Sequence, residues 1–502
     1  MFDVQFVDAL QSAFAPASIL FSVLGIVIGI VFGAIPGLTA TLAIALFVPI
    51  TFIMSPTHGL IMLGGIYAGA IFGGSISAIL INVPGTPASI ITGWEGYAMA
   101  RRGDAPYALA LAAVSSGIGG AMSAIAMLFL TPVLAKLALS FGPPEFVALL
   151  VFSLAIVVVM LDTPLMHNVL GCLLGLTLAS IGQDPINGES RFTFGMPDLL
   201  SGVDLLAVLI GFFCMAQAVF LAREALSDEK TITVDFGGIM GIWRVMKTMI
   251  SSFWTYLRAT AAGVFLGIMP AIGPESTPFV AHAIEKRFSR SPEEFGKGST
   301  QGLIASETSI SANVGGSLIP LLSLGIPGSA AAAVFIGALT LHGMQPGPLL
   351  FVEHGAEMYT FLVAFVVTNI FMVFIGLFAI RYFAVVLKAP KGWIAAFVAF
   401  FSIFGSYAVN SRLFDVGIMF LATAFTILLR FLRIPILPVV LGLILGSLLE
   451  QNLVVFSITV NTVPDLLARP VAVALFVLTA VILGVSVYKR MRIPAQARST
   501  SP

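Results

Sequence analysis

Long apolar stretches, separated by short polar segments, fill most of this chain. Examples of around 20 residues with their flanks are centred on Val147–Leu161, Leu205–Leu221, Phe361–Ile380 and Val471–Val487. An α-helix needs about 20 apolar residues to cross a hydrocarbon core of about 30 Å. The pattern predicts an all-α polytopic membrane protein with about 10–12 transmembrane helices.

The apolar pattern is interrupted by glycine and proline in the same order twice. Gly33 and Pro36 recur 234 residues later as Gly267 and Pro270. Three further landmarks recur at offsets of 242, 243 and 240: Gly73-Gly74-Ser75 as Gly315-Gly316-Ser317, Pro84-Gly85 as Pro327-Gly328, and Gly103 with Pro106 as Gly343 with Pro346. This order predicts an internal duplication. We expect a first repeat over 1–222, a cytoplasmic connecting loop and amphipathic arm over 223–258, a second repeat over 259–488 and a cytoplasmic tail over 489–502.

Loop charge indicates that the two repeats have opposite orientations, because cytoplasmic loops retain Lys and Arg. Arg101 and Arg102 follow the first Pro-Gly pair, whereas the corresponding loop over 341–348 has neither residue type. Basic segments instead flank 259–283 on both sides, although about 25 residues cannot cross the bilayer twice. The sequence therefore predicts that this segment is re-entrant and broken at Pro270. Inverted repeats with discontinuous helices are typical of secondary transporters.

Polar side chains near the breaks suit a small anion. A helix that restarts after Pro-Gly directs free N–H groups and its positive dipole end toward the break. Packing is the alternative, because Gly and Ser also let transmembrane helices approach closely. The predicted substrate-binding residues are Gly37, Thr39, Ser75, Asn82, Pro84, Gly85, Thr86, Pro87, Ser89, Asn313, Ser317, Pro327, Gly328 and Ser329.

Two acidic residues beside the second-repeat breaks are candidates for ion coupling. They are Glu275, in the segment GPEST with Ser276 and Thr277, and Glu307, in ASETS. Ionisable groups inside a membrane are costly and are usually functional. We expect them to bind Na⁺ or carry a proton; capping a half-helix or lining a wet vestibule is the alternative explanation.

Several other classes of function are excluded by composition. The chain has 24 basic and 24 acidic residues, which argues against nucleic-acid binding, and 58% of its residues are hydrophobic. The two cysteines are far apart, the five histidines lack metal-ligand spacing, and no nucleophile with a partner base stands out. We expect no metal site, no tightly bound cofactor, no catalytic residues and no enzymatic activity.

The ordered motifs around these breaks resemble the large membrane subunit of the tripartite tricarboxylate transporters, the TctA family. The resemblance is carried by GIVIGIVFGAIPGLTATLAIALFVPITF, YAGAIFGGSISAILINVPGTPAS, GYAMARRGDAPYALALAAVSSGIGG, GIMPAIGPESTPFVAH and SETSISANVGGSLIPLLSLGIPGSAAAA. It implies a multi-pass permease of the bacterial inner membrane. It also implies two partners, a small TctB-like membrane subunit and a periplasmic TctC-like solute-binding protein. The latter would deliver a carboxylate such as citrate, or a dicarboxylate.

The predicted mechanism is alternating access driven by an ion gradient, since the chain has no Walker A motif. An anion channel and a membrane enzyme acting on a lipid-linked substrate remain as alternatives. Replacing Gly85 or Gly328 by Leu is expected to abolish uptake while leaving membrane insertion intact.

Overall fold

The structure is a computed structural model of the full chain. It describes residues 2–492 except 162, 185–187, 226–241, 271, 384–388 and 461. Residues 226–241 of the predicted connecting loop and arm, and the predicted tail from residue 493 on, lie outside the described residues.

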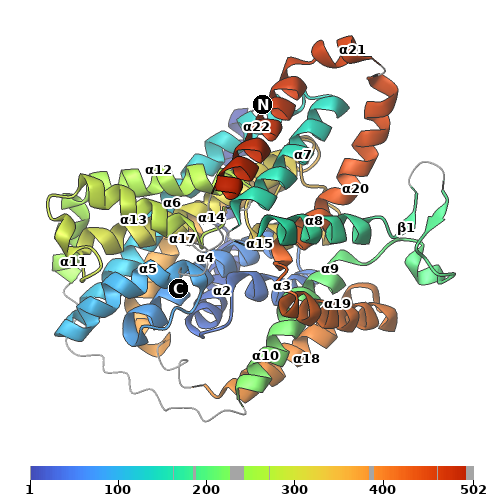
Figure 1. Cartoon of the computed structure of the whole chain (residues 1–502). Helices are drawn as coiled ribbons and strands as arrows, with labels where there is room; N and C mark the ends of the chain where they lie inside the picture. Colours follow the sequence, from blue (N-terminus) through green and yellow to red (C-terminus); the bar gives the residue numbers. More distant parts are fainter. Residues whose placement is uncertain are drawn as a thin grey trace. The chain divides into compact units, whose positions relative to one another are not determined.

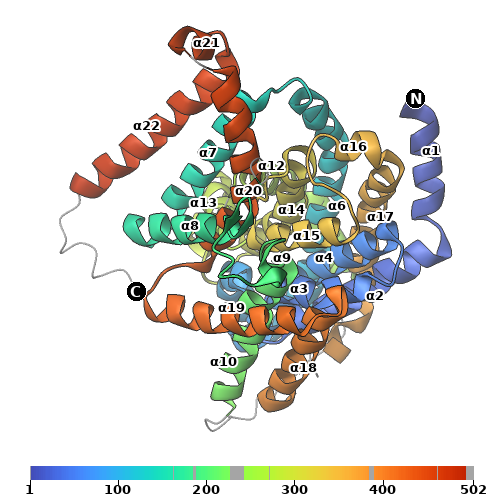
Figure 2. The ribbon, with the colours of Figure 1, turned by 90° about the vertical axis from the view of Figure 1, so that its right-hand side faces the viewer.

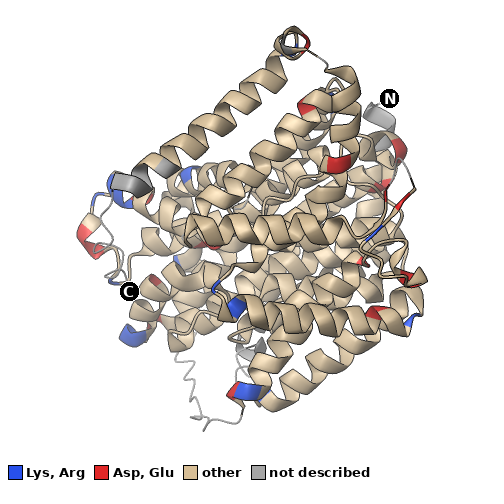
Figure 3. Ribbon diagram, turned by 45° about the vertical axis from the view of Figure 1, so that its right-hand side comes forward, with Lys and Arg blue, Asp and Glu red and all other residues tan. Residues whose placement is uncertain are grey.

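The described part of the chain is almost entirely helical, which confirms the predicted fold class (Figure 1). Within it, nine helices are long and apolar enough to cross a membrane, and four shorter apolar helices accompany them. The long helices carry their charged residues mainly at their ends (Figure 3). The two strands that are described, β1 (Gly182–Gln183) and β2 (Ser190–Arg191), form a short antiparallel hairpin.

The chain forms two compact units. The first contains Met1–Lys136 and Asp204–Phe425, and the second contains Leu137–Val203 and Thr426–Pro502. This division differs from the predicted repeats, which follow chain order. Helices α6 (Ala105–Ala138) and α19 (Leu413–Phe431) run from one unit into the other.

The first unit contains the segments that the sequence marks as duplicated. Its remaining elements are α1 (Phe2–Ala13), α2 (Pro16–Ala34), α3 (Ala40–Thr51), α4 (Pro56–Ile81), η1 (Pro87–Ser89), α5 (Ile90–Thr92), η2 (Gly93–Tyr97), η3 (Ala100–Asp104), α9 (Leu205–Leu209), η5 (Ile210–Met215), α10 (Ala216–Glu224), α11 (Ile242–Ser251), α12 (Phe253–Ile268), α13 (Thr277–Phe288), η6 (Pro292–Glu294), α14 (Thr300–Leu324), α15 (Ala330–Leu341), α16 (Leu350–Glu353), α17 (Gly355–Phe383) and α18 (Lys391–Asn410).

The same helix pair is built twice in this unit. Helix α2 packs against α4, and α12 packs against α14, in both cases through glycines that allow backbone contact. A Cβ atom on Gly33 would lie 2.0 Å from the carbonyl oxygen of Ala70, and one on Gly267 would lie 2.8 Å from that of Asn313. Side chains are therefore excluded at equivalent places in the two pairs.

The break after each pair also has the same geometry. Helix α4 ends at Asn82 and α14 at Gly325, both in the left-handed conformation, with φ of 55° and 75°. The Gly85 N–H then donates to the carbonyl of Gly74 at 3.1 Å, and the Gly328 N–H donates to that of Ser317 at 3.4 Å. The duplication seen in the sequence thus recurs as a pair of equivalent backbone contacts.

The chain also breaks between α2 and α3 and between α12 and α13. Helix α3 packs against α4, α13 packs against both α12 and α14, and α15 packs against α3 and α4 (Figure 2). These contacts place the two breaks and the two Pro-Gly segments next to helices α4 and α14. The opposite orientation of the two repeats stays a prediction.

The second unit consists of α7 (Pro143–Met160), α8 (Leu165–Ala179), η4 (Pro197–Leu199), α20 (Ile436–Thr459), α21 (Val463–Leu467) and α22 (Pro470–Arg492), together with the β-hairpin. Helix α20 packs against α7 and α8, and α22 packs against α7. Arg191 of the hairpin pairs with Glu450 at 2.6 Å, and Arg469 pairs with Glu145 at 3.4 Å.

Candidate functional site

The second Pro-Gly segment holds a small cluster of buried hydroxyl groups. Ser329 is the N-cap residue of α15 and accepts a hydrogen bond from the Ala332 N–H at 3.1 Å. Its Oγ lies 2.8 Å from the hydroxyl oxygen of Tyr67, which also lies 3.3 Å from the Oγ of Ser317. Since Tyr67 belongs to α4, the first repeat supplies a side chain to the break of the second.

The break at Pro270 lies beside this cluster. A Cβ atom on Gly273 would lie 2.2 Å from a carboxylate oxygen of Glu275 and 3.6 Å from the Cβ of Ser329. Asn313 donates through Nδ2 to the carbonyl of Ile272 at 3.0 Å and to the Thr277 hydroxyl at 2.8 Å. The structure thus gathers Glu275, Thr277 and Asn313 next to Ser329.

One acceptor in this cluster is left unused. The Oδ1 atom of Asn313 is buried and has no hydrogen-bond partner in the described part of the chain. A buried polar atom without a partner is destabilising by about 1–3 kcal/mol unless a ligand or water satisfies it. This atom is therefore suited to contact a bound cation or a protonated group.

In the first Pro-Gly segment, the hydroxyl groups bond to each other and to the backbone of the same segment. The Oγ1 of Thr86 lies 3.1 Å from the Oγ of Ser89, which donates to the Thr86 carbonyl at 2.9 Å. Thr39 accepts from the Leu42 N–H at 3.2 Å and so serves as the N-cap of α3. Four other predicted residues near these breaks do not place a buried side chain there. Gly37 has no side chain and has a φ of 92°, and Asn82, Pro87 and Ser276 are exposed.

Glu307 is the centre of a separate, fully buried network. Its carboxylate accepts hydrogen bonds from Ser75 at 2.6 Å, from Ser116 at 2.8 Å and from Thr92. These hydroxyls come from α4, α6 and α5, whereas Glu307 belongs to α14. The predicted substrate residue Ser75 and the predicted coupling residue Glu307 are therefore bonded to each other.

The paired glycines have a packing role that revises one prediction. A Cβ atom on Gly85 would lie 2.1 Å from the carbonyl oxygen of Gly33, and one on Gly328 would lie 2.3 Å from that of Gly267. Leu at either position would push two backbones apart. We expected these variants to insert normally and to lose only uptake. The glycine contacts indicate instead that the variants disturb helix packing, so they do not test ligand contact.

A second buried carboxylate, Glu95 of η2, binds the loop that precedes α14. It accepts from the N–H groups of Gly296, Gly298 and Ser299 at 2.6, 2.9 and 2.7 Å, and lies 2.7 Å from His282 Nε2. Both glycines have positive φ, which lets successive N–H groups converge on one anion. Burial opposes ionisation, but these bonds outweigh it and hold the pKa of Glu95 below its usual value.

Comparison with known proteins assigns the chain to a family. Residues 19–441 match the family described as the tripartite tricarboxylate transporter TctA family. The chain belongs to the TctA family. A 52.8 kDa protein of Agrobacterium vitis from the TAR-I ttuC' 3' region is 34% identical to this TctA-family chain over 443 residues, or 88% of each chain.

A second protein of Agrobacterium vitis, from the TAR-II ttuC' 3' region, is 30% identical over 191 residues, or 38% of this chain and 79% of that protein. No solved structure matches the chain. Membership of the TctA family makes the chain a multi-pass subunit of a tricarboxylate transporter, within a system that contains other subunits. This supports the predicted absence of enzymatic function.

Sequence reasoning about this TctA-family chain missed four residues that complete these clusters. Tyr67, Thr92 and Ser116 bond to partners more than 190 positions away, and Glu95 binds a loop more than 200 positions away. Glu95 had a usable signal, because it is an acidic residue between the apolar segment and Arg101. The sequence gives no comparable signal for Tyr67, Thr92 and Ser116, since each lies in an apolar segment among other small residues.

Proposed function

We propose that this chain is the permease subunit that imports a carboxylate, such as citrate or a dicarboxylate, across the bacterial inner membrane. Transport proceeds by alternating access coupled to Na⁺ or H⁺. A small TctB-like membrane subunit and a periplasmic TctC-like binding protein complete the system, and the binding protein delivers the substrate. The family and the paired break geometry support this assignment.

The observation that carries the proposal is the hydroxyl cluster formed by Tyr67, Ser317 and Ser329 at the start of α15. Hydroxyl groups and the first N–H groups of a helix bind a carboxylate without a permanent positive charge inside the bilayer. By the offsets of the duplication, the corresponding residues of the first repeat are Ser75 and Thr86. The Ser75 hydroxyl donates instead to Glu307 at 2.6 Å.

The coupling ion is assigned to the neighbouring acceptors. Glu275 offers carboxyl oxygens and Asn313 offers an unused Oδ1, and these acceptors suit a cation better than a carboxylate. Both suit Na⁺, which prefers oxygen ligands, and Glu275 also suits a proton. Neutralising Glu275 in this way would lower its repulsion of a carboxylate at Ser329, which couples the two sites.

The test is uptake of radiolabelled citrate by proteoliposomes that contain the complete transporter and its binding protein. Imposed Na⁺ and H⁺ gradients are compared with no gradient. Tyr67→Phe removes one hydroxyl from the cluster and is expected to lower uptake at subsaturating citrate by about 10-fold or more, since a hydrogen bond to a charged group contributes about 1.5–3 kcal/mol.

Ser323→Ala is the matched control, because the Ser323 hydroxyl only donates to the Ile319 carbonyl within α14 at 2.6 Å. Uptake should stay within about twofold of wild type for this variant. Equal losses in both variants would contradict the site. Uptake that does not saturate and needs no gradient would identify a channel, and conversion of a substrate to a product would identify an enzyme.

A further inference from the structure

A polar cavity of about 510 Å³ lies in the first unit, away from both Pro-Gly segments. Its walls come from the first turn of α12, the end of α13 and the start of α14. The volume is typical of sites that bind a small ligand or a headgroup. The lining residues that carry hydrogen-bonding side chains are Ser251, Ser252, Trp254, Thr255, Arg258, Glu285, Ser289, Arg290, Ser291, Glu294, Ser299, Thr300 and Gln301.

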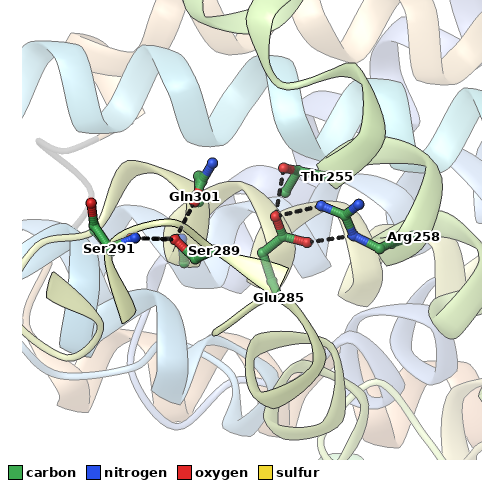
Figure 4. Close-up of polar contacts among 8 residues, drawn as sticks. Thr255, Arg258, Glu285, Ser289, Ser291 and Gln301 are labelled. Atoms are coloured by element: carbon green, nitrogen blue, oxygen red, sulfur yellow. Dashed lines mark hydrogen bonds and ion pairs between the residues drawn. The ribbon is translucent and has the colours of Figure 1, made fainter. Parts of the chain in front are cut away.

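One wall of this cavity is an ion pair that is already satisfied (Figure 4). Arg258 donates to Glu285 from Nε at 2.9 Å and from Nη2 at 2.8 Å, and Thr255 donates to the same carboxylate at 2.7 Å. This bidentate arrangement neutralises Glu285 and fixes the guanidinium plane. The Nη1 atom of Arg258 remains without a partner in the described part of the chain.

Other donors also line the cavity. Ser252 is only 7% exposed and lines the cavity, and its side chain does not cap α12. Arg290 is exposed and, within the same described ranges, forms no ion pair. Ser252 precedes α12, so the first N–H groups and positive dipole end of this helix lie at this region. The N–H groups of Gly298 and Ser299 before α14 are already bound by Glu95.

These groups together favour an anion with several acceptor oxygens. Glu285 is neutralised by Arg258, which leaves Glu294 as the remaining acid against Arg290, the N-terminus of α12 and the Ser252 hydroxyl. Phosphate matches this set, because it accepts several hydrogen bonds at once and is a preferred partner of arginine and of helix N-termini.

Aromatic residues at the rim indicate where the anion comes from. Trp254 is 65% exposed and Phe288 is 64% exposed, and the Arg258 guanidinium lies 5.2 Å from the Phe288 ring centre. Exposed Trp and Phe beside basic residues are typical of the membrane–water interface. The loop charges predict that this interface is the cytoplasmic one.

We propose that this cavity binds a phosphate group, carried by the headgroup of a membrane phospholipid whose acyl chains lie against Trp254 and Phe288. Arg290, the Nη1 of Arg258 and the Ser252 hydroxyl contact the phosphate. This site is independent of the proposed carboxylate site, since it shares no residue with it.

The experiment is a titration of the detergent-purified full chain with three probes: dioctanoyl phosphatidylglycerol, dioctanoylglycerol, which lacks the phosphate, and inorganic phosphate. Tryptophan fluorescence and calorimetry report binding. The phospholipid should bind and dioctanoylglycerol should bind at least about 10-fold more weakly. Arg290→Gln should weaken phospholipid binding by about 10-fold, whereas Arg287→Gln should change it less than about twofold.

Arg287 is the matched control because it is exposed at the same end of α13 but does not line the cavity. Ser252→Ala is a second, milder variant that should weaken binding by about threefold or more. Inorganic phosphate that binds as tightly as the phospholipid, and competes with it, would support the phosphate site with a soluble source. Equal binding of dioctanoylglycerol, equal effects of Arg290→Gln and Arg287→Gln, or no binding of any probe would overturn the inference.

Discussion

Replacing Glu95 by Gln should open the loop before α14 without disturbing the helices around it. The Glu95 carboxylate accepts three backbone N–H bonds, from Gly296 at one oxygen and from Gly298 and Ser299 at the other. An amide keeps one acceptor oxygen and replaces the other with NH₂, a donor. The best orientation preserves the Gly298 and Ser299 bonds and leaves the Gly296 N–H facing a donor.

The size of the effect follows from these three bonds. Hydrogen bonds to a charged acceptor contribute about 1.5–3 kcal/mol and neutral ones about 0.5–1.5 kcal/mol, so the two retained bonds each lose about 1 kcal/mol. The Gly296 bond to the charged carboxylate is lost altogether, which costs about 1.5–3 kcal/mol. The total of about 3–5 kcal/mol corresponds to about 10²–10⁴ times more frequent opening of the loop.

Hydrogen exchange measures this opening directly. Peptides covering 292–302 should exchange about 100-fold faster or more in Glu95→Gln, whereas peptides from α6 should be unchanged. Glu293→Gln is the control, because Glu293 is an exposed acid in the same loop. Less than a threefold change at 292–302, or an equal change in Glu293→Gln, would refute the assignment of the carboxylate as the group that holds the loop.

Three further predictions follow from individual contacts. Loop protection by Glu95 should be lost at acid pH, because a lowered folded-state pKa makes the carboxylate stabilising above its unfolded value of about 4.3, and this contribution disappears as pH falls through the folded pKa; exchange corrected for intrinsic rate tests this. Glu307→Gln places an NH₂ donor against hydroxyls that donate to the carboxyl oxygens, so it should lower stability by about 1–3 kcal/mol and reduce citrate uptake, measured by thermal unfolding and transport. Gly328→Ala places a Cβ 2.3 Å from the Gly267 carbonyl oxygen and should reduce the monodisperse fraction in gel filtration, whereas Gly417→Ala, with open space around its Cβ, should not.

The sequence was sufficient for features that depend on local composition. Apolar length predicts the helices, and the break at Pro84-Gly85 and its counterpart at Pro327-Gly328 align by offset alone. The contact of each glycine with the opposite helix could not be predicted, because it depends on how α2 packs on α4 and α12 on α14. Its consequence for Leu substitution was therefore missed.

The candidate site was predicted in part for the same reason. Ser317, Ser329 and Glu275 lie close together, as their positions near two breaks indicate. The partner hydroxyl of Tyr67 was missed because it reaches them from 250 and 262 positions away along the chain. Pairing over such a separation depends on the tertiary packing of α4 against α14 and α15.

Under the proposed alternating-access mechanism, the polar contacts between the two predicted repeats constrain which elements move. Tyr67 of the first repeat bonds to the second break, and Glu307 of the second repeat bonds to Ser75, Thr92 and Ser116 of the first. Separating the repeats along this surface would leave a buried carboxylate without its donors, at a cost of about 1.5–3 kcal/mol for each bond. Since Glu95 also ties the first repeat to the start of α14, we expect α4, α5 and α14 to move together as one body during transport. The change of access would then occur at the outer surfaces of this body and leave its internal hydrogen bonds intact.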